Sequence, residues 1–85
     1  MKYSIYTENK NKELIEQVVS EYFDGFTIIE ATGYWKGSKE QSLIIEILDF
    51  NDDSLKIRSL AKDIKTMNKQ ESVLVTWAKV SNIFI

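Results

Sequence analysis

The positions of hydrophobic residues along the chain follow two periods, one typical of strands and one typical of helices. Residues Lys2–Tyr6 are rich in β-forming side chains and predict a first strand. From Asn11 to Phe23, apolar residues recur every three or four positions with acidic and amide side chains between them, which predicts an amphipathic helix. Asp24-Gly25 is expected to end this helix, with Gly25 in the left-handed conformation.

Two alternating runs follow, and together they predict an antiparallel β-hairpin. Phe26–Trp35 and Glu40–Phe50 each alternate with a period of two, and the polar residues Lys36–Lys39 between them form a turn. The cluster Asn51–Ser54 is typical of a helix N-terminus, and the apolar spacing from Leu55 to Met67 predicts a second amphipathic helix.

The last part of the chain predicts one further strand and leaves its end open. Gln70–Trp77 is rich in β-branched residues, while Val80–Ile85 fits either a short fifth strand or a tail laid over the core. The resulting order βαββαβ predicts an α+β protein with the ferredoxin-like arrangement, an antiparallel sheet with both helices on one face. We expect residues 1–85 to form a single domain of this kind.

The sheet face without helices is expected to be too apolar for water. If Ile29, Ala31 and Trp35 face the helices together with Leu43, Ile45 and Ile47, the other face carries Phe26, Ile28, Tyr34, Ile44, Leu48 and Phe50 beside Glu30, Thr32, Ser42 and Glu46. An apolar patch of that size usually marks an interface, so we expect the chain to form a homo-oligomer through the sheet. The alternatives are a bulge that exchanges the faces of one hairpin strand, or a tail that covers the patch.

Composition excludes several classes of function. Eleven Lys and Arg against thirteen Asp and Glu give a net charge of −2, which disfavours binding to nucleic acid. The absence of Cys and His excludes the usual zinc, iron–sulfur and haem sites and every catalytic dyad built on those residues. Asp49, Asp52 and Asp53 are better explained by helix capping than by a cation site. We therefore expect no metal and no cofactor, and any acid–base chemistry must use carboxylates, Lys, Tyr, Ser or Thr.

No stretch approaches the roughly 20 apolar residues of a membrane span. We therefore expect no membrane partner and a cytoplasmic location, in a bacterial host if the protein is encoded by a phage. The Lys- and Asn-rich composition is typical of phage or low-GC bacterial proteins.

Candidate binding residues gather around the predicted hairpin turn. Gly33–Gly37 sets Tyr34, Trp35 and Lys36 between two glycines, a composition suited to stacking on a flat ring and contacting an anion. Trp35 is also explained by packing on the helices, whereas Tyr34 points toward the predicted interface.

Four carboxylates accompany these residues. Glu30 and Glu46 fall on the interface side of adjacent strands, and Glu40 and Glu71 lie near strand ends. A carboxylate in a partly apolar seam can act as a general base or bind a hydroxyl group. The alternative is that these acids form ion pairs with lysines across subunits.

Two stretches resemble an uncharacterised bacterial domain family of PII-like shape. The residues that carry the resemblance are Phe23–Ile47, with its Asp-Gly and Gly-x-Trp phrases, and Lys69–Val75, with Gln-Glu-Ser-Val-Leu. The resemblance implies a PII-like fold and a homotrimer, and it implies no particular activity.

A looser similarity is to the small phage S-adenosylmethionine lyases, which are trimeric PII-like proteins. It rests on Gly33-x-Trp35, Glu40 and the segment Gln70–Val75, although here Tyr34 directly follows the glycine and the lyases carry longer loops. The similarity implies that an intersubunit carboxylate, Glu40 or Glu46, positions or deprotonates the sulfonium substrate while Tyr34 contacts its adenosyl group. No added cofactor would be needed.

Three functions follow from these observations. The first is a non-catalytic protein that binds a small nucleotide-derived ligand between subunits and sequesters a nucleotide signal for a phage, through Tyr34, Trp35, Lys36, Glu40, Glu46 and Glu71. The second is an S-adenosylmethionine lyase with Glu40 or Glu46 as the catalytic carboxylate. The third is a protein-interaction module with no ligand.

Overall fold

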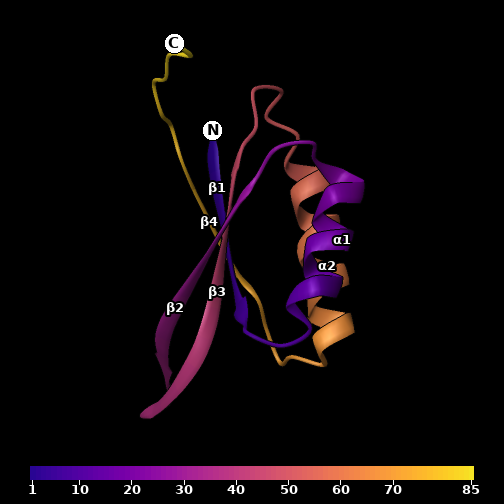
Figure 1. Ribbon diagram of the computed structural model, residues 1–85, viewed down its shortest axis with the longest axis vertical. Helices are drawn as coiled ribbons and strands as arrows, with labels where there is room; N and C mark the ends of the chain where they lie inside the picture. The colour runs from indigo at the N-terminus through magenta and orange to yellow at the C-terminus, as the bar shows by residue number, and fades with distance from the viewer.

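The computed structural model describes residues 1–85 and contains one sheet and two helices (Figure 1). The elements are β1 (Lys2–Glu8), α1 (Lys12–Tyr22), β2 (Thr27–Trp35), β3 (Ser38–Leu48), α2 (Ser54–Asn68) and β4 (Leu74–Ala78). The predicted order βαββαβ is confirmed. No helix of the structure is both long enough and apolar enough to cross a membrane.

The four strands form an antiparallel sheet in the order β2-β3-β1-β4, and both helices cover one of its faces (Figure 1). Each helix connects two strands that have a third strand between them, which is the ferredoxin-like topology. As a result, the ends of β1 and β2 and the starts of β3 and β4 lie at the same end of the sheet.

The core lies between the helices and the covered face of the sheet. Its buried residues alternate along the strands and recur every three or four positions along the helices: Tyr3, Ile5, Leu43, Ile45, Ile47, Ile15, Val19, Ile57, Leu60 and Ile64.

The two helices are held at their ends by different means. Asp53 caps α2 by accepting a hydrogen bond from the backbone N–H of Lys56 at 3.1 Å, as the acidic cluster predicted. The predicted left-handed Gly25 at the end of α1 is wrong, because that helix ends at Tyr22 and continues directly into extended backbone at Phe23. No left-handed residue is needed where the chain leaves a helix in the extended conformation.

The assignment of faces in β2 was inverted in our prediction. The register pairs Ile28 with Ile45, so Ile28 faces the helices, while Ile29 lies opposite Ile44 on the helix-free face. The cause is the loop Lys36-Gly37, whose two residues both have positive φ, as in a type I′ turn. Because this loop has two residues, each odd-numbered residue of β2 pairs with an even-numbered residue of β3, as Trp35 does with Ser38. Paired residues lie on the same face, so the odd-numbered residues of the two strands lie on opposite faces.

The helix-free face, called the open face below, is nevertheless apolar. Its outward apolar residues are Ile29, Ala31 and Trp35 of β2, Ile44 and Leu48 of β3, Tyr6 of β1, and Leu74 and Ala78 of β4. The same face also carries Gly33 and the polar residues Lys2, Ser4, Glu8, Glu40, Ser42, Glu46 and Thr76, most of which lie toward the sheet ends or on β1. Ile44, Leu48, Ser42 and Glu46 belong to it as predicted, whereas Ile28, Tyr34, Glu30 and Thr32 lie on the opposite side of β2. The prediction is also wrong for Phe26, which precedes β2 and packs against the core, and for Phe50, which lies in the turn after β3.

The C-terminal part of the chain departs from the prediction at two points. β4 begins at Leu74 rather than Gln70, and residues 79–85 form no fifth strand. Phe84 contacts the ring of Phe50, but Ile83, Phe84 and Ile85 remain largely exposed, so this segment does not cover the core.

Candidate functional site

A hollow of about 550 Å³ opens at the end of the sheet where the β2–β3 hairpin turns. We call it the hairpin hollow. Its lining residues are Tyr6, Thr7, Glu8, Ala31, Thr32, Gly33, Tyr34, Trp35, Glu40, Ser42, Ile44, Gln70, Glu71, Ser72 and Leu74. Most of these residues belong to the open face, so the hollow continues into the apolar surface described above.

The floor of the hollow crosses all four strands. Ala31 lies opposite Ser42, Ser42 lies opposite Glu8, and Tyr6 lies opposite both Ile44 and Leu74. A Cβ atom added to Gly33 would lie 2.7 Å from the Ser42 hydroxyl oxygen. The missing side chain at Gly33 therefore keeps this part of the floor open.

The walls come from the hairpin tip and the α2–β4 loop. The Lys36 ammonium at the tip lies 3.9 Å from the Glu71 carboxylate in the loop. The same ammonium lies 5.7 Å from the centroid of the Trp35 ring. The tip of the hairpin extends past the ends of both helices (Figure 1), which explains why Tyr34, on the helix side of β2, stays exposed. Trp35 is exposed because it lies on the open face, which no helix covers.

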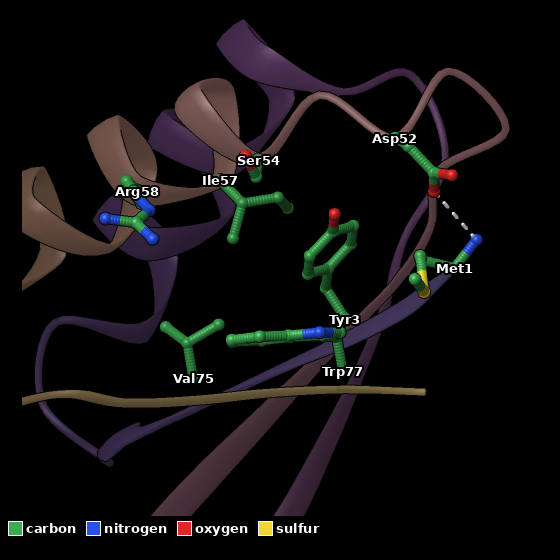
Figure 2. Close-up of a pocket in the computed structure, with 8 residues that line it drawn as sticks. All are labelled: Met1, Tyr3, Asp52, Ser54, Ile57, Arg58, Val75 and Trp77. Carbon is green, nitrogen blue, oxygen red and sulfur yellow. Dashed lines mark hydrogen bonds and ion pairs between the residues drawn. The ribbon is translucent and has the colours of Figure 1, made fainter. Parts of the chain in front are cut away.

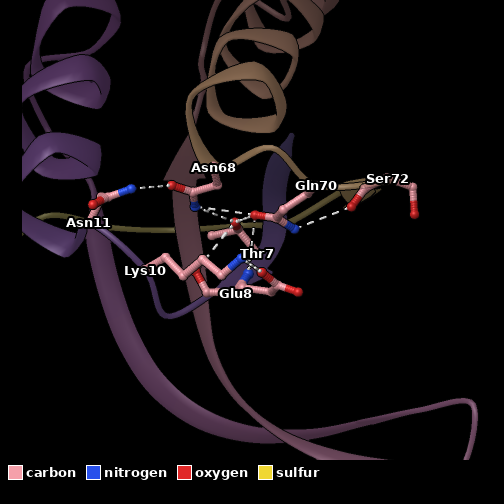
Figure 3. A network of polar contacts seen from close by, with 7 residues as sticks. All are labelled: Thr7, Glu8, Lys10, Asn11, Asn68, Gln70 and Ser72. Atoms are coloured by element: carbon pink, nitrogen blue, oxygen red, sulfur yellow. Dashed lines mark hydrogen bonds and ion pairs between the residues drawn. The ribbon is translucent and has the colours of Figure 1, made fainter.

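A network of polar side chains fixes the loop side of the hollow (Figure 3). The Gln70 side-chain oxygen accepts hydrogen bonds from the Thr7 hydroxyl and, at 3.4 Å, from the Glu8 backbone N–H. The buried Asn68 amide donates to Thr7 and to Gln70 at 3.3 and 3.2 Å, and it accepts from Asn11 at 3.2 Å. The end of β1, the start of α1 and the α2–β4 loop are therefore tied together.

The structure brings most of the predicted site residues together. Tyr34, Trp35, Glu40 and Glu71 line the hollow, and Lys36 adjoins it through its ion pair with Glu71. Glu46 lies elsewhere, farther along the open face, where its carboxylate is 3.6 Å from the Lys2 ammonium. Glu30 is on the helix side of β2, paired with Lys12 at 2.9 Å.

Sequence reasoning missed Glu8 and Gln70, which both line the hollow. A signal for them was available, because the predicted topology brings the end of the first strand and the start of the last strand to the same edge as the hairpin turn. The Glu8 carboxylate is paired with the Lys10 ammonium at 2.8 Å.

The electrostatic character of the hollow is acidic. Three carboxylates, those of Glu8, Glu40 and Glu71, line it without any lysine or arginine in the lining. Glu8 and Glu71 each have an ion-pair partner, while Glu40 takes part in none of the ion pairs of the chain. No group of three or more metal-ligating side chains has the geometry to hold a metal ion.

The model of one protein family, described as a protein of unknown function (DUF3574), matches residues 4–84. The chain belongs to this family. No curated protein matches its sequence. The resemblance to an uncharacterised family with a PII-like shape is thus confirmed.

Solved structures similar to this DUF3574 chain have the same fold. A DUF3240 family protein from Shewanella baltica OS155 is 14% identical, with a TM-score of 0.72 and coverage of 99% of this chain and 93% of that chain. A phage SAM lyase in the apo state is 19% identical, with a TM-score of 0.68 and coverage of 87% and 75%. A PII-like nitrogen regulatory protein from Thiomonas intermedia K12, bound to ADP, AMP and bicarbonate, is 17% identical, with a TM-score of 0.66 and coverage of 98% and 93%. At these identities the likeness shows the ferredoxin-like, PII-like fold alone.

Proposed function

We propose that this DUF3574 protein binds a small adenosyl ligand in the hairpin hollow, as a homo-oligomer whose neighbouring subunit covers the open face. The observation that carries the proposal is the composition of the hollow, in which two exposed aromatic rings and three carboxylates surround about 550 Å³. Clefts of this volume are typical of sites for small molecules. The rings supply stacking surfaces for a base, and the carboxylates accept hydrogen bonds from ribose hydroxyl and amino groups.

The charge of the hollow bears on which adenosyl ligand fits. A polyphosphate chain would meet carboxylates, because the cations paired with the lining, Lys10 and Lys36, are engaged by Glu8 and Glu71. A nucleoside or a cationic adenosyl compound such as S-adenosylmethionine avoids this repulsion and gains from the free carboxylate of Glu40. Among nucleotide-derived ligands, we therefore favour those that carry no polyphosphate. Tight binding without turnover would suit a phage protein that sequesters such a molecule.

Calorimetric titration with S-adenosylmethionine, adenosine and ADP tests this proposal. We expect S-adenosylmethionine to bind most tightly and ADP least tightly. Glu40→Gln should weaken binding of S-adenosylmethionine by about tenfold, as expected for loss of one close charge pair. Glu13→Gln, an exposed and unpaired acid on α1, is the matched control and should change nothing. Failure of all three compounds to bind at millimolar concentration would refute the proposal and favour the protein-interaction module.

A lyase is the second candidate, and the unpaired state of Glu40 favours it. In this reaction the bond between the sulfonium sulfur and the amino-acid side chain breaks, and the sulfur leaves with the bonding pair as methylthioadenosine. The carboxylate accepts a proton from the neighbouring carbon, and the electrons of that carbon–hydrogen bond form a carbon–carbon double bond, so the second product is an unsaturated amino acid. Of the two carboxylates predicted for this role, we favour Glu40, because Glu46 is paired with Lys2 outside the hollow. Tyr34 would contact the adenosyl group.

Chromatography of S-adenosylmethionine after incubation with the protein separates the two candidates. A lyase would yield methylthioadenosine, and this product should vanish with Glu40→Gln and persist with Glu46→Gln. Intact substrate after hours with micromolar protein, together with measurable binding, would leave the non-catalytic role.

A further inference from the structure

A second cavity lies on the opposite face of the sheet and at its opposite end. It has a volume of about 490 Å³ and lies between the N-terminal half of α2 and the strands β1 and β4 (Figure 2). We call it the α2 groove. Ile57 and Arg58 contribute to its helix wall, while Tyr3, Val75 and Trp77 line it from the sheet.

The sheet side of the α2 groove offers a flat aromatic surface. The Trp77 ring lies along β4 (Figure 2) and remains 60% exposed, although its neighbours Tyr3 and Ile57 are buried. Its centroid lies 6.5 Å from that of Tyr3. Stacking a planar apolar ligand on this exposed indole is favourable, because it removes the apolar surface of both rings from water.

The Tyr3 hydroxyl is a polar group without a partner. Tyr3 is only 5% exposed and lines the cavity, yet no hydrogen bond joins its hydroxyl to any residue drawn around it (Figure 2). Burial and the nearby carboxylates of Asp52, Asp49 and Asp53 raise the pKa of this phenol, so it keeps its proton at neutral pH. It can therefore donate a hydrogen bond to an acceptor inside the groove.

One cation of the groove is free to bind an anion. Asp49 and Asp53, which lie near Tyr3, accept hydrogen bonds from backbone N–H groups and do not line the groove. Arg58, the only arginine of the chain, takes part in none of its ion pairs. The one carboxylate of the lining, Asp52, is already engaged by the Met1 ammonium at 3.1 Å. A guanidinium without a counter-ion is well suited to bind a carboxylate through two parallel hydrogen bonds.

From these features we propose that the α2 groove is a second binding site, for a small planar aromatic carboxylate. The ring of the ligand stacks on Trp77 and contacts Val75 and Ile57, and its carboxylate pairs with Arg58. The Tyr3 hydroxyl donates to an acceptor of the ligand. This site is independent of the hairpin hollow, so neither proposal requires the other.

Nuclear magnetic resonance of the two indole N–H groups provides the test, with 2-naphthoate as the probe and 2-naphthamide as its uncharged counterpart. A Trp35→Phe variant assigns the two signals. We expect 2-naphthoate to shift the Trp77 signal saturably and 2-naphthamide to bind about tenfold more weakly.

Variants of the full chain locate the contacts. Arg58→Gln should weaken 2-naphthoate binding by about tenfold. Lys62→Gln removes an exposed positive charge from the next turn of α2 and should leave binding unchanged. The proposal is overturned if the shifts are confined to Trp35, or if Arg58→Gln binds as the wild type does. It is equally overturned if the Trp77 signal moves on dilution alone and ignores the probe, since a second copy would then occupy the groove.

Discussion

Tyr3 shows how one residue can serve both the core and the surface. Its ring belongs to the buried cluster beneath the helices, while its hydroxyl lines the α2 groove. The phenol therefore lies in a poorly solvated position near three carboxylates, and both effects disfavour its ionisation.

The raised pKa of Tyr3 predicts a loss of stability in alkali. Above the ordinary tyrosine pKa of about 10, the unfolded chain releases this proton before the folded chain does, so the free energy of unfolding falls as pH rises toward the folded-state pKa. Tyr3→Phe should flatten this alkaline decline. Urea denaturation at a series of pH values from neutral to above 10 measures it. Parallel declines in both proteins would contradict the assignment.

The sequence predicts where Asn68 lies in its helix but not which residues it contacts. The periodicity of α2 predicts that this position faces inward, but a buried amide among apolar residues gives no indication of its partners. Those partners, Thr7, Asn11 and Gln70, come from three other parts of the chain. Single-sequence reasoning therefore predicted the helix and missed the network that shapes one wall of the hairpin hollow.

At the scale of elements, the hairpin loop determines which residues of β2 and β3 line the hollow. Its two residues have positive φ, 51° at Lys36 and 78° at Gly37, and this short loop fixes the pairing of β2 with β3. The apolar alternation of each strand was readable from the sequence. The relation between the two strands was not used, and this is why Tyr34 and Trp35 were assigned to the wrong faces.

Two glycine variants test the role of this loop. Gly37→Ala should lower the free energy of unfolding by about 1 kcal/mol, because a side chain disfavours the left-handed conformation. Gly25→Ala is the matched control, since an added Cβ there meets no atom within 4 Å and the backbone φ is not positive. Thermal unfolding of both variants makes the comparison, and equal effects would mean that the loop does not constrain the hairpin.

Element boundaries were least predictable where tertiary contacts replace strand pairing. Gln70 begins a β-branched stretch and was expected to start the last strand. Instead its side chain bonds to Thr7 and to the Glu8 backbone, and the chain pairs with β1 only from Leu74 onward. Glu40 lies near the start of β3 and Glu71 lies in the loop before β4, and the topology alone brings these two parts of the chain to the same end of the sheet.

The whole molecule presents an apolar sheet face that its own helices leave uncovered. Ile44 lies in the centre of this open face, between Ile29 on β2 and Tyr6 on β1. If a second copy covers the face, Ile44→Asp would bury an unpaired charge and should dissociate the assembly. Leu55→Asp adds the same charge at an exposed position in the first turn of α2 and serves as the control.

Light scattering behind a sizing column measures this effect. We expect the wild type and Leu55→Asp to elute as the same oligomer, a trimer by the PII-like resemblance, and Ile44→Asp to elute as a monomer. A wild-type monomer at tens of micromolar would rule out association through the sheet.

The ion pair between Lys36 and Glu71 is the only ion pair that links the hairpin tip to the α2–β4 loop, and both side chains are exposed. Exposed pairs are weak and are screened by dissolved ions, with a Debye length of about 8 Å at physiological ionic strength and about 3 Å at 1 M. The latter is shorter than the 3.9 Å between the two charges. Ionic strength therefore tunes how firmly the tip is held over the hollow, and binding there should be measured at a fixed salt concentration.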